Sequence, residues 1–297
     1  MKKRTYFVTA ILAAMAVLSL SSCLKDPRYY TFANVGTLVE LPLAAYYGTG
    51  NTVPEALPIQ STPQTIPVVV NVASPKPLST PLNVTLAVDQ AALDAYNTAN
   101  GSSYTLPPAN AYTISNFKVT VPAGQRQAQL QIQVISSNLD PAGAYILPLS
   151  ITDASGQKIS NYKTILLNIQ AKNQYDGTYS MTGTVTRVNG GVPDVVLGGP
   201  YKAGLTTVLA TTGANTVSFT QDWATGAEAG GVNPLQLAID PSTNKVTVTS
   251  TINGTLANDP AYNNHYDPAT KTFYLQYAWS TPGTRGATDT LTYVGPR

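Results

Sequence analysis

The stretch AYILPLSITDASGQKISNYKTILLNIQ, residues 144–170, shows most clearly what kind of fold the sequence encodes. In each of its two halves apolar residues recur at every second position, and these are Leu147, Leu149 and Ile151, then Ile165, Leu167 and Ile169. A period of two is the signature of a β-strand that buries one face. The stretch therefore predicts two strands that face the same core.

The same alternation recurs from residue 37 to residue 172. It is present in IPVVVNVA (66–73) and PLNVTLAVD (81–89), and we interpret FKVTVPAGQRQAQLQIQV (117–134) as a hairpin that turns at Pro122–Gly124. One short helix is expected between Asp89, a good N-cap, and Gly101, a natural C-terminal stop. Short alternating strands with a single helix predict an immunoglobulin-like β-sandwich over residues 37–172.

A polar stretch, AKNQYDGTYS (171–180), interrupts the alternation and marks the boundary to a second domain, residues 173–297. Further strands follow it, separated by turn signals rich in Gly, Pro, Asn and Asp. Two of these turns, at 240–245 and 267–271, begin Asp-Pro-x-Thr and are predicted to connect hairpins. An antiparallel meander of this length can close and so remove its exposed edges. The expected fold is all-β, with a C-terminal, lipocalin-like antiparallel β-barrel.

The N-terminus has the layout of a bacterial lipoprotein signal. Three basic residues are followed by an apolar run, Tyr6 to Leu20, which is shorter than the roughly 20 residues of a membrane-spanning helix. Cys23, the only cysteine, follows two serines. We predict that residues 1–22 are removed, that Cys23 is lipidated and anchors the chain to a membrane, and that residues 23–36 form a tether. An ordinary secretory signal with an incidental cysteine is the alternative.

The composition argues against several classes of function. Charged residues make up 11% of the chain and the net charge is +2, with no basic cluster after residue 4, so no nucleic-acid partner is expected. A single histidine, His265, leaves little for a His-based zinc site or a catalytic triad. We predict that the protein binds no cofactor and no metal and that it is not an enzyme. The oxygen-rich segment 259–267 could hold Ca²⁺, but we interpret it as a turn with Asx-type capping.

Recognition of a sugar requires exposed aromatic faces beside polar side chains. Trp223 lies next to Gln221 and Asp222 in a loop-like stretch, TQDWATGAEAGG (220–231). Tyr262 and Tyr266 flank a second polar stretch that contains Asn263. These six residues are the candidate glycan site, with packing in the core as the alternative for the aromatic residues.

Several segments resemble a known group of proteins. LDAYNTANGSSYTLPPANAYTIS (93–115), together with the signal around Cys23, is similar to the N-terminal domain of surface lipoproteins from glycan-degrading Gram-negative gut bacteria. NQYDGTYSMTGTV (173–185) resembles the lipocalin-like domain that often follows it. Leu24-Lys25-Asp26 is similar to the charged stretch that sends such lipoproteins to the outer face of the outer membrane.

The resemblance implies a non-catalytic protein that captures glycans beside an outer-membrane importer. The expected partners are the membrane, through Cys23, a glycan and an importer complex. A structural, adhesin-type or importer-accessory lipoprotein without glycan binding is the first alternative, and a glycoside hydrolase, which needs two carboxylates at the scissile bond, is the second.

Overall fold

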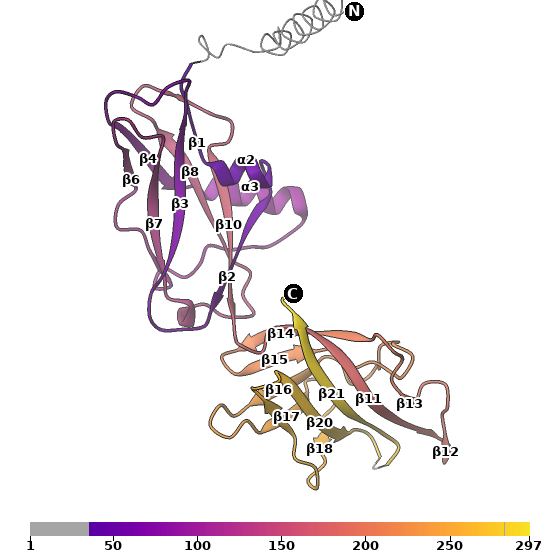
Figure 1. The fold of residues 1–297 in the computed structure, drawn as a ribbon. Coiled ribbons are helices and arrows are strands. Elements are labelled where there is room, and N and C mark those ends of the chain that lie inside the picture. Colours follow the sequence, from indigo (N-terminus) through magenta and orange to yellow (C-terminus); the bar gives the residue numbers. More distant parts are fainter. Residues whose placement is uncertain (1–35, 282) are drawn as a thin grey trace, which may run out of the picture.

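The computed structural model of the protein describes residues 36–281 and 283–297. Cys23, the predicted signal and nearly all of the predicted tether lie outside these residues. The predicted all-β fold with two β domains is confirmed: a sandwich is followed by a curled, barrel-like sheet (Figure 1). Neither helix within the described ranges has the length and apolar content of a membrane span.

The sandwich consists of two five-stranded sheets. The strand order in the first is β5 (Tyr112–Thr113), β7 (Gln127–Val134), β3 (Gln64–Ala73), β1 (Leu38–Glu40) and β9 (Lys158–Ile159). The order in the second is β2 (Thr52–Pro58), β10 (Thr164–Lys172), β8 (Ile146–Asp153), β4 (Leu82–Val88) and β6 (Lys118–Val121). The strand pair predicted from residues 144–170 is confirmed, because β8 and β10 are antiparallel neighbours with Leu147 opposite Leu167.

The hairpin predicted for residues 117–134 is wrong. Its first arm, β6, pairs with β4 in one sheet, and its second arm, β7, pairs with β3 in the other. The turn at Pro122–Gly124 therefore crosses from sheet to sheet over the shared core. Both arms bury one face in that core, and this produces the same alternation as a hairpin would.

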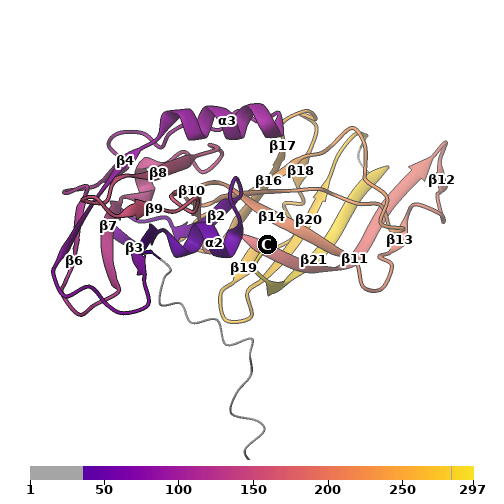
Figure 2. The ribbon, with the colours of Figure 1, turned by 90° about the horizontal axis from the view of Figure 1, so that it is seen from above.

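The predicted helix is α3 (Gln90–Asn100). The Asp89 side chain accepts a hydrogen bond from the main-chain N–H of Ala92, and Gly101 ends the helix in the left-handed region with φ of 59°. Leu93 on its apolar face packs on the outer side of β8 and β10 (Figure 2). A second helix, α2 (Pro42–Tyr47), was not expected; it ends at Tyr47 after Tyr46, which is 82% exposed.

The second domain is an eleven-stranded antiparallel sheet. Its main path is β17 (Val246–Ser250), β16 (Leu235–Ile239), β15 (Thr216–Phe219), β14 (Thr206–Gly213), β11 (Gly177–Asn189), β21 (Arg285–Gly295), β20 (Thr272–Ala278) and β18 (Ala257–Asn258). Three short strands pair beside this path: β12 (Val192–Pro193), β13 (Gly199–Pro200) and β19 (His265–Asp267). Alternate side chains from these strands fill the interior.

The sheet curls until β17 approaches β18 and β19. We call the line along which these strands meet the seam, and two asparagines form hydrogen bonds across it. The amide of Asn258 donates to the carbonyl of Val246 (2.8 Å) and accepts from the N–H of Val248 (2.9 Å), as a neighbouring peptide group would. The main-chain carbonyl of Asn264 accepts from the N–H of Val246 (3.0 Å).

The predicted Asp-Pro turns are also confirmed, because Asp240 and Asp267 cap the β16–β17 and β19–β20 connections.

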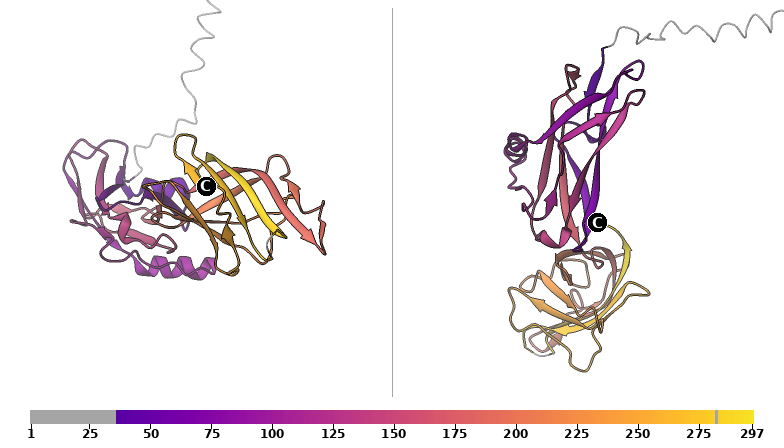
Figure 3. Two further views of the ribbon diagram at one scale, coloured as in Figure 1. Left: turned by 90° about the horizontal axis from the view of Figure 1, so that it is seen from below. Right: turned by 90° about the vertical axis from the view of Figure 1, so that its left-hand side faces the viewer.

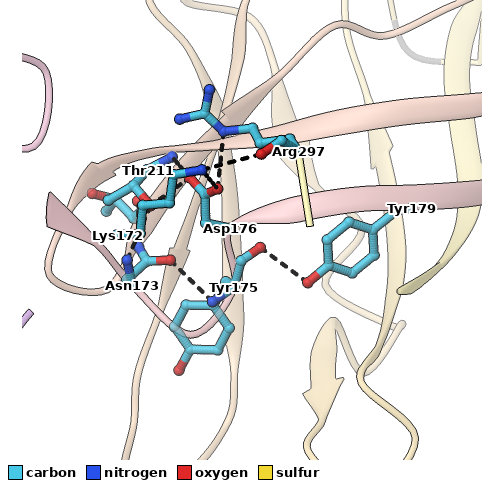
Figure 4. Close-up of polar contacts among 8 residues, drawn as sticks. Lys172, Asn173, Tyr175, Asp176, Tyr179, Thr211 and Arg297 are labelled. Atoms are coloured by element: carbon cyan, nitrogen blue, oxygen red, sulfur yellow. Dashed lines mark hydrogen bonds and ion pairs between the residues drawn. The ribbon is translucent and has the colours of Figure 1, made fainter. Parts of the chain in front are cut away.

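The two domains are arranged end to end, with the barrel at the end of the sandwich that lies far from β1 (Figures 1 and 3). Asp176 connects the barrel to the linker and to the C-terminus. Its carboxylate accepts from the main-chain N–H and the hydroxyl of Thr211 (2.8 Å each) and pairs with Arg297 (2.9 Å) and Lys172 (3.3 Å) (Figure 4). Asn173 beside it donates to the carbonyls of Gly213 and Thr216.

Candidate functional site

Trp223 lies inside the barrel, at the end that points away from the sandwich. Its side chain is buried and 7% exposed, so it does not present the open face expected of a residue in a loop. Its ring is 5.9 Å from that of Trp279, measured between ring centroids. Two arginines lie over the Trp223 ring. The guanidinium carbon of Arg187 is 4.6 Å from the ring centroid, and that of Arg285 is 5.7 Å from it.

The strand register explains why two arginines meet there. Arg187 near the end of β11 is the direct antiparallel partner of Arg285 at the start of β21. Side chains that are directly opposite in an antiparallel pair lie on the same face, and like charges in this arrangement repel. Ten residues separate Arg187 from Gly177, the first residue of β11, which corresponds to about 33 Å of extended strand. The arginine pair is thus far from the junction with the sandwich.

One carboxylate forms an ion pair with Arg187. Asp194, in the segment between β12 and β13, lies 3.0 Å from Nε of Arg187 through its Oδ2. Hydrogen bonds from the N–H groups of Leu197 and Val196 lower the pKa of Asp194, and the charges of Arg187 and Arg285 add to this effect. Asp194 therefore remains ionised at neutral pH. We call Arg187, Asp194, Trp223, Trp279 and Arg285 the distal mouth.

A surface hollow of about 460 Å³ adjoins the distal mouth. It lies between β11 and the segment that carries β12 and β13, and its lining includes Arg187, Asp194, Thr186 and Val195. Val195 itself is 87% exposed. A hollow of this size is within the range of small-ligand pockets, which is about 300–1,000 Å³.

Gln221, a predicted site residue, is fully buried below the mouth and belongs to a polar network with Tyr201, Tyr277 and Asp289. Its Nε2 donates to the Tyr201 hydroxyl (2.5 Å) and to the carbonyl of Asp222 (2.8 Å), and its Oε1 contacts the Tyr277 hydroxyl. The carboxylate of Asp289 is 2.6 Å from each of these two tyrosine hydroxyls. The network closes into a ring within the barrel.

All hydrogen bonds of this ring are satisfied when Asp289 carries a proton. The Asp222 carbonyl fixes the orientation of the Gln221 amide, so both amide protons are used, and Tyr201 donates its proton to Asp289. Tyr277 has one proton but contacts two acceptors, Oε1 of Gln221 and Oδ2 of Asp289. A proton on Oδ2 completes every contact. Burial raises the pKa of Asp289 to about 6, although its hydrogen bonds with Tyr201 and Tyr277 lower it, so the neutral form is present mainly below about pH 6.

Asp222, the third candidate, lies on the other side of the chain from Gln221 and Trp223, because neighbouring side chains in an extended segment alternate. It forms an isolated antiparallel bridge with Glu228. Burial raises its pKa, and the nearby charge of Glu228 raises it further. Asp222 therefore does not belong to the distal mouth.

The second predicted cluster lies elsewhere. Tyr266 is 4% exposed and packs on Tyr175 and Phe273, with ring centroids 4.9 and 4.7 Å away, so the prediction that it offers a stacking face is wrong. Phe273 on β20 and Trp279 directly after this strand are six residues apart, which corresponds to about 20 Å of extended chain between the two ring clusters. Tyr262 is half-buried and Asn263 is exposed, both in the connection between β18 and β19 that helps to close the seam.

Arg187, Arg285 and Asp194 were not predicted from the sequence as site residues. Arg187 and Arg285 are 98 positions apart in the chain, and only the register of β11 against β21 brings them together. The alternation along each strand was visible, but it does not show which residue lies opposite which. Among the described residues no three His, Cys, Asp or Glu side chains gather as a metal site would require.

Comparisons with known proteins match this architecture domain by domain. One family model, which describes an N-terminal domain, matches residues 37–158, and a second, described as a domain of unknown function (DUF7015), matches residues 177–295. A search of curated proteins finds no match. Each of the two family models covers one of the two β domains.

Solved structures share the fold of both domains together. Two proteins of unknown function from Bacteroides ovatus are 17% and 13% identical, with TM-scores of 0.57 and 0.59; the matches cover 86% and 88% of this chain and 94% and 95% of theirs. An auxiliary nutrient binding protein from Bacteroides thetaiotaomicron is 15% identical, with a TM-score of 0.52 over 83% of this chain and 91% of its own. At such identities the likeness concerns the fold.

Proposed function

We propose that this protein is a non-catalytic surface lipoprotein that binds a saccharide in the distal mouth of its barrel. The observation that carries the proposal is that Trp223, which packs against Trp279, meets two arginines there, beside a hollow of ligand size. Flat aromatic and guanidinium groups suit the faces and hydroxyls of a sugar ring. This assignment replaces the exposed Trp223 face that the sequence predicted with a surface on which Arg187 covers the indole.

The lipid anchor and the location are part of the same proposal. In it, Cys23 carries the lipid and holds the protein on the extracellular side of the outer membrane, next to an importer. The described chain begins beside β1, and the barrel lies at the opposite end of the sandwich. The sandwich then acts as a spacer that presents the distal mouth away from the membrane. The match to an auxiliary nutrient binding protein supports this proposal.

The test is binding of the purified full chain, in detergent, to a broad glycan array, followed by calorimetry with the best ligand. Arg187→Met removes the guanidinium over Trp223 but keeps most of the apolar stem, and we expect it to weaken binding by about tenfold or more. Lys245→Gln removes a positive charge outside the mouth and should leave affinity unchanged. If no glycan binds, the proposal fails and an importer-accessory role without glycan binding takes its place.

Glycoside hydrolysis is the second candidate, and one observation favours it. Asp222 and Glu228 are antiparallel bridge partners, so their Cβ atoms lie on one face about 5 Å apart, and a glycosidase needs two such neighbouring carboxyl groups. Release of reducing sugar that is lost in Asp222→Asn would establish this reaction in place of simple binding. Unchanged saccharide after long incubation is the result that the proposed binding function expects.

A further inference from the structure

We propose that the saccharide bound in the distal mouth carries a carboxylate, as a hexuronate unit does, and that Arg285 is its anchor. This inference rests on the proposed function and specifies the class of ligand. The pair of Arg187 and Arg285 brings two positive charges to one face of the sheet, and Asp194 supplies one negative charge. The mouth is therefore left with one positive charge that no described carboxylate neutralises within ion-pair distance.

Asp194 cannot neutralise Arg285 as well, because its oxygens are already engaged. Its Oδ1 accepts from the N–H groups of Val196 (3.0 Å) and Leu197 (3.1 Å). Its Oδ2 accepts from the Asn189 amide (3.1 Å) and faces Nε of Arg187. These contacts hold the carboxylate at Arg187 and fix the segment that forms one wall of the hollow.

Arg285 has little to bind in this structure. Its only side-chain hydrogen-bond contact in the described chain is with the side-chain oxygen of Asn189, at 3.5 Å, which is the limit of such a bond. Its Nη1 is buried and has no hydrogen-bond partner among residues 36–281 and 283–297. A buried donor without an acceptor costs free energy, and more so when it carries a charge. An incoming anion would remove this cost.

The chemistry of the arginine selects a carboxylate. A guanidinium group presents its N–H donors in a plane, and a carboxylate accepts two of them at once. The guanidinium carbon of Arg285 lies 5.7 Å from the centroid of the Trp223 ring. Thr186 lines both the hollow at Arg187 and a neighbouring hollow of about 210 Å³ at Arg285, so the two hollows adjoin each other.

A nucleic acid or a phospholipid surface does not fit the same features. Such partners require a patch of several basic residues. The chain carries 17 Lys and Arg against 15 Asp and Glu, and the mouth contributes one uncompensated charge. A single charge beside a small hollow fits a single acidic sugar within an oligosaccharide.

The experiment compares acidic oligosaccharides with their own neutral counterparts. Oligogalacturonate, alginate and hyaluronan fragments are titrated into the full chain in detergent, before and after chemical reduction of their carboxyl groups to alcohols. We expect at least one acidic fragment to bind, and its reduced form to bind about tenfold or more weakly. Arg285→Gln should lower affinity for the acidic form to that of the reduced form, Arg285→Lys should lower it less, and Lys245→Gln should leave it unchanged.

Each other outcome overturns a defined part of the account. Equal affinity for acidic and reduced forms, or binding of neutral glycans alone, would show that the site does not recognise a carboxylate. The proposed function, binding of a saccharide, would still hold. If Arg285→Gln does not weaken the binding of an acidic fragment, the site does not include Arg285. Binding of no saccharide at all defeats the proposed function as well. Melting curves of each variant confirm that it is folded.

Discussion

The two ends of the barrel contain similar aromatic side chains but use them differently. At the end near the sandwich, Tyr175, Tyr179, Tyr266 and Phe273 pack against one another with ring centroids 4.7–6.0 Å apart, and the Tyr179 hydroxyl donates to the carbonyl of Tyr175. At the distal mouth, Trp223, which packs against Trp279, lies beside two arginines that repel each other. The aromatic residues of the near end pack on one another, whereas at the distal mouth the buried Nη1 of Arg285 has no hydrogen-bond partner among the described residues.

The largest expected effect tests the near end. Phe273 is fully buried, so Phe273→Ala should destabilise the barrel by about 3–5 kcal/mol in urea unfolding. Phe273→Leu, which leaves a smaller cavity, should cost clearly less. A loss below about 1 kcal/mol for Phe273→Ala would contradict the view that this end is tightly packed.

The buried ring between the two ends predicts a dependence of stability on pH. The pKa of Asp289 is raised to about 6 in the folded protein, compared with about 3.9 in the unfolded chain, so the folded state binds more protons between these values. The stabilising contribution of the neutral acid is therefore complete below about pH 4 and is lost as the pH rises through about 6. The full difference is about 3 kcal/mol.

Asp289→Asn is the matched variant for this prediction. Asparagine can accept from Tyr201 and donate to Tyr277, so it reproduces the neutral acid at every pH. We expect the Asp289→Asn variant to lack the loss of unfolding free energy between about pH 4 and pH 7 and to be at least as stable as the parent at about pH 8. A parent protein whose stability rises over that interval would show that Asp289 is ionised.

Asp176 at the junction should behave in the opposite way. Burial favours its neutral form, but hydrogen bonds from Arg297 and Thr211 outweigh this and lower its pKa. Its contribution is therefore present above the unfolded pKa, about 3.9, and is lost as the pH falls below that value. Asp176→Asn should cost about 1–3 kcal/mol at neutral pH in urea unfolding. An equally stable variant would mean that the junction does not depend on this carboxylate.

The smallest effect on stability is expected at the mouth itself. Arg285→Gln removes one of two like charges that lie directly opposite each other, so the unfolding free energy should change by less than about 1 kcal/mol, with a gain as the favoured direction. The same urea titrations that are used for Phe273→Ala measure it. A loss of about 2 kcal/mol or more would show that Arg285 is a structural residue, and the contrast between the two ends would disappear.

The sequence predicted much of the fold because alternation is a local property. The strands β8 and β10, the helix α3 and the Asp-Pro turns all follow from short stretches, and all are confirmed. The hairpin at 117–134 failed because two strands that face one core alternate in the same way whether they share a sheet or not. The candidate site was harder, since Arg187 and Arg285 meet only through strand register. Trp223 was a candidate from the sequence, with packing in the core as its alternative, but its position beneath two arginines was not predicted.

The most direct test uses the chain's own fluorescence. Its only two tryptophans, Trp223 and Trp279, both lie in the distal mouth, so tryptophan emission reports on this site alone. Titration with an oligosaccharide that binds in calorimetry should produce a saturable change in emission with the same dissociation constant, and Arg187→Met should weaken both signals equally. Binding that is measured by calorimetry while the tryptophan emission stays constant would place the site elsewhere and contradict the account.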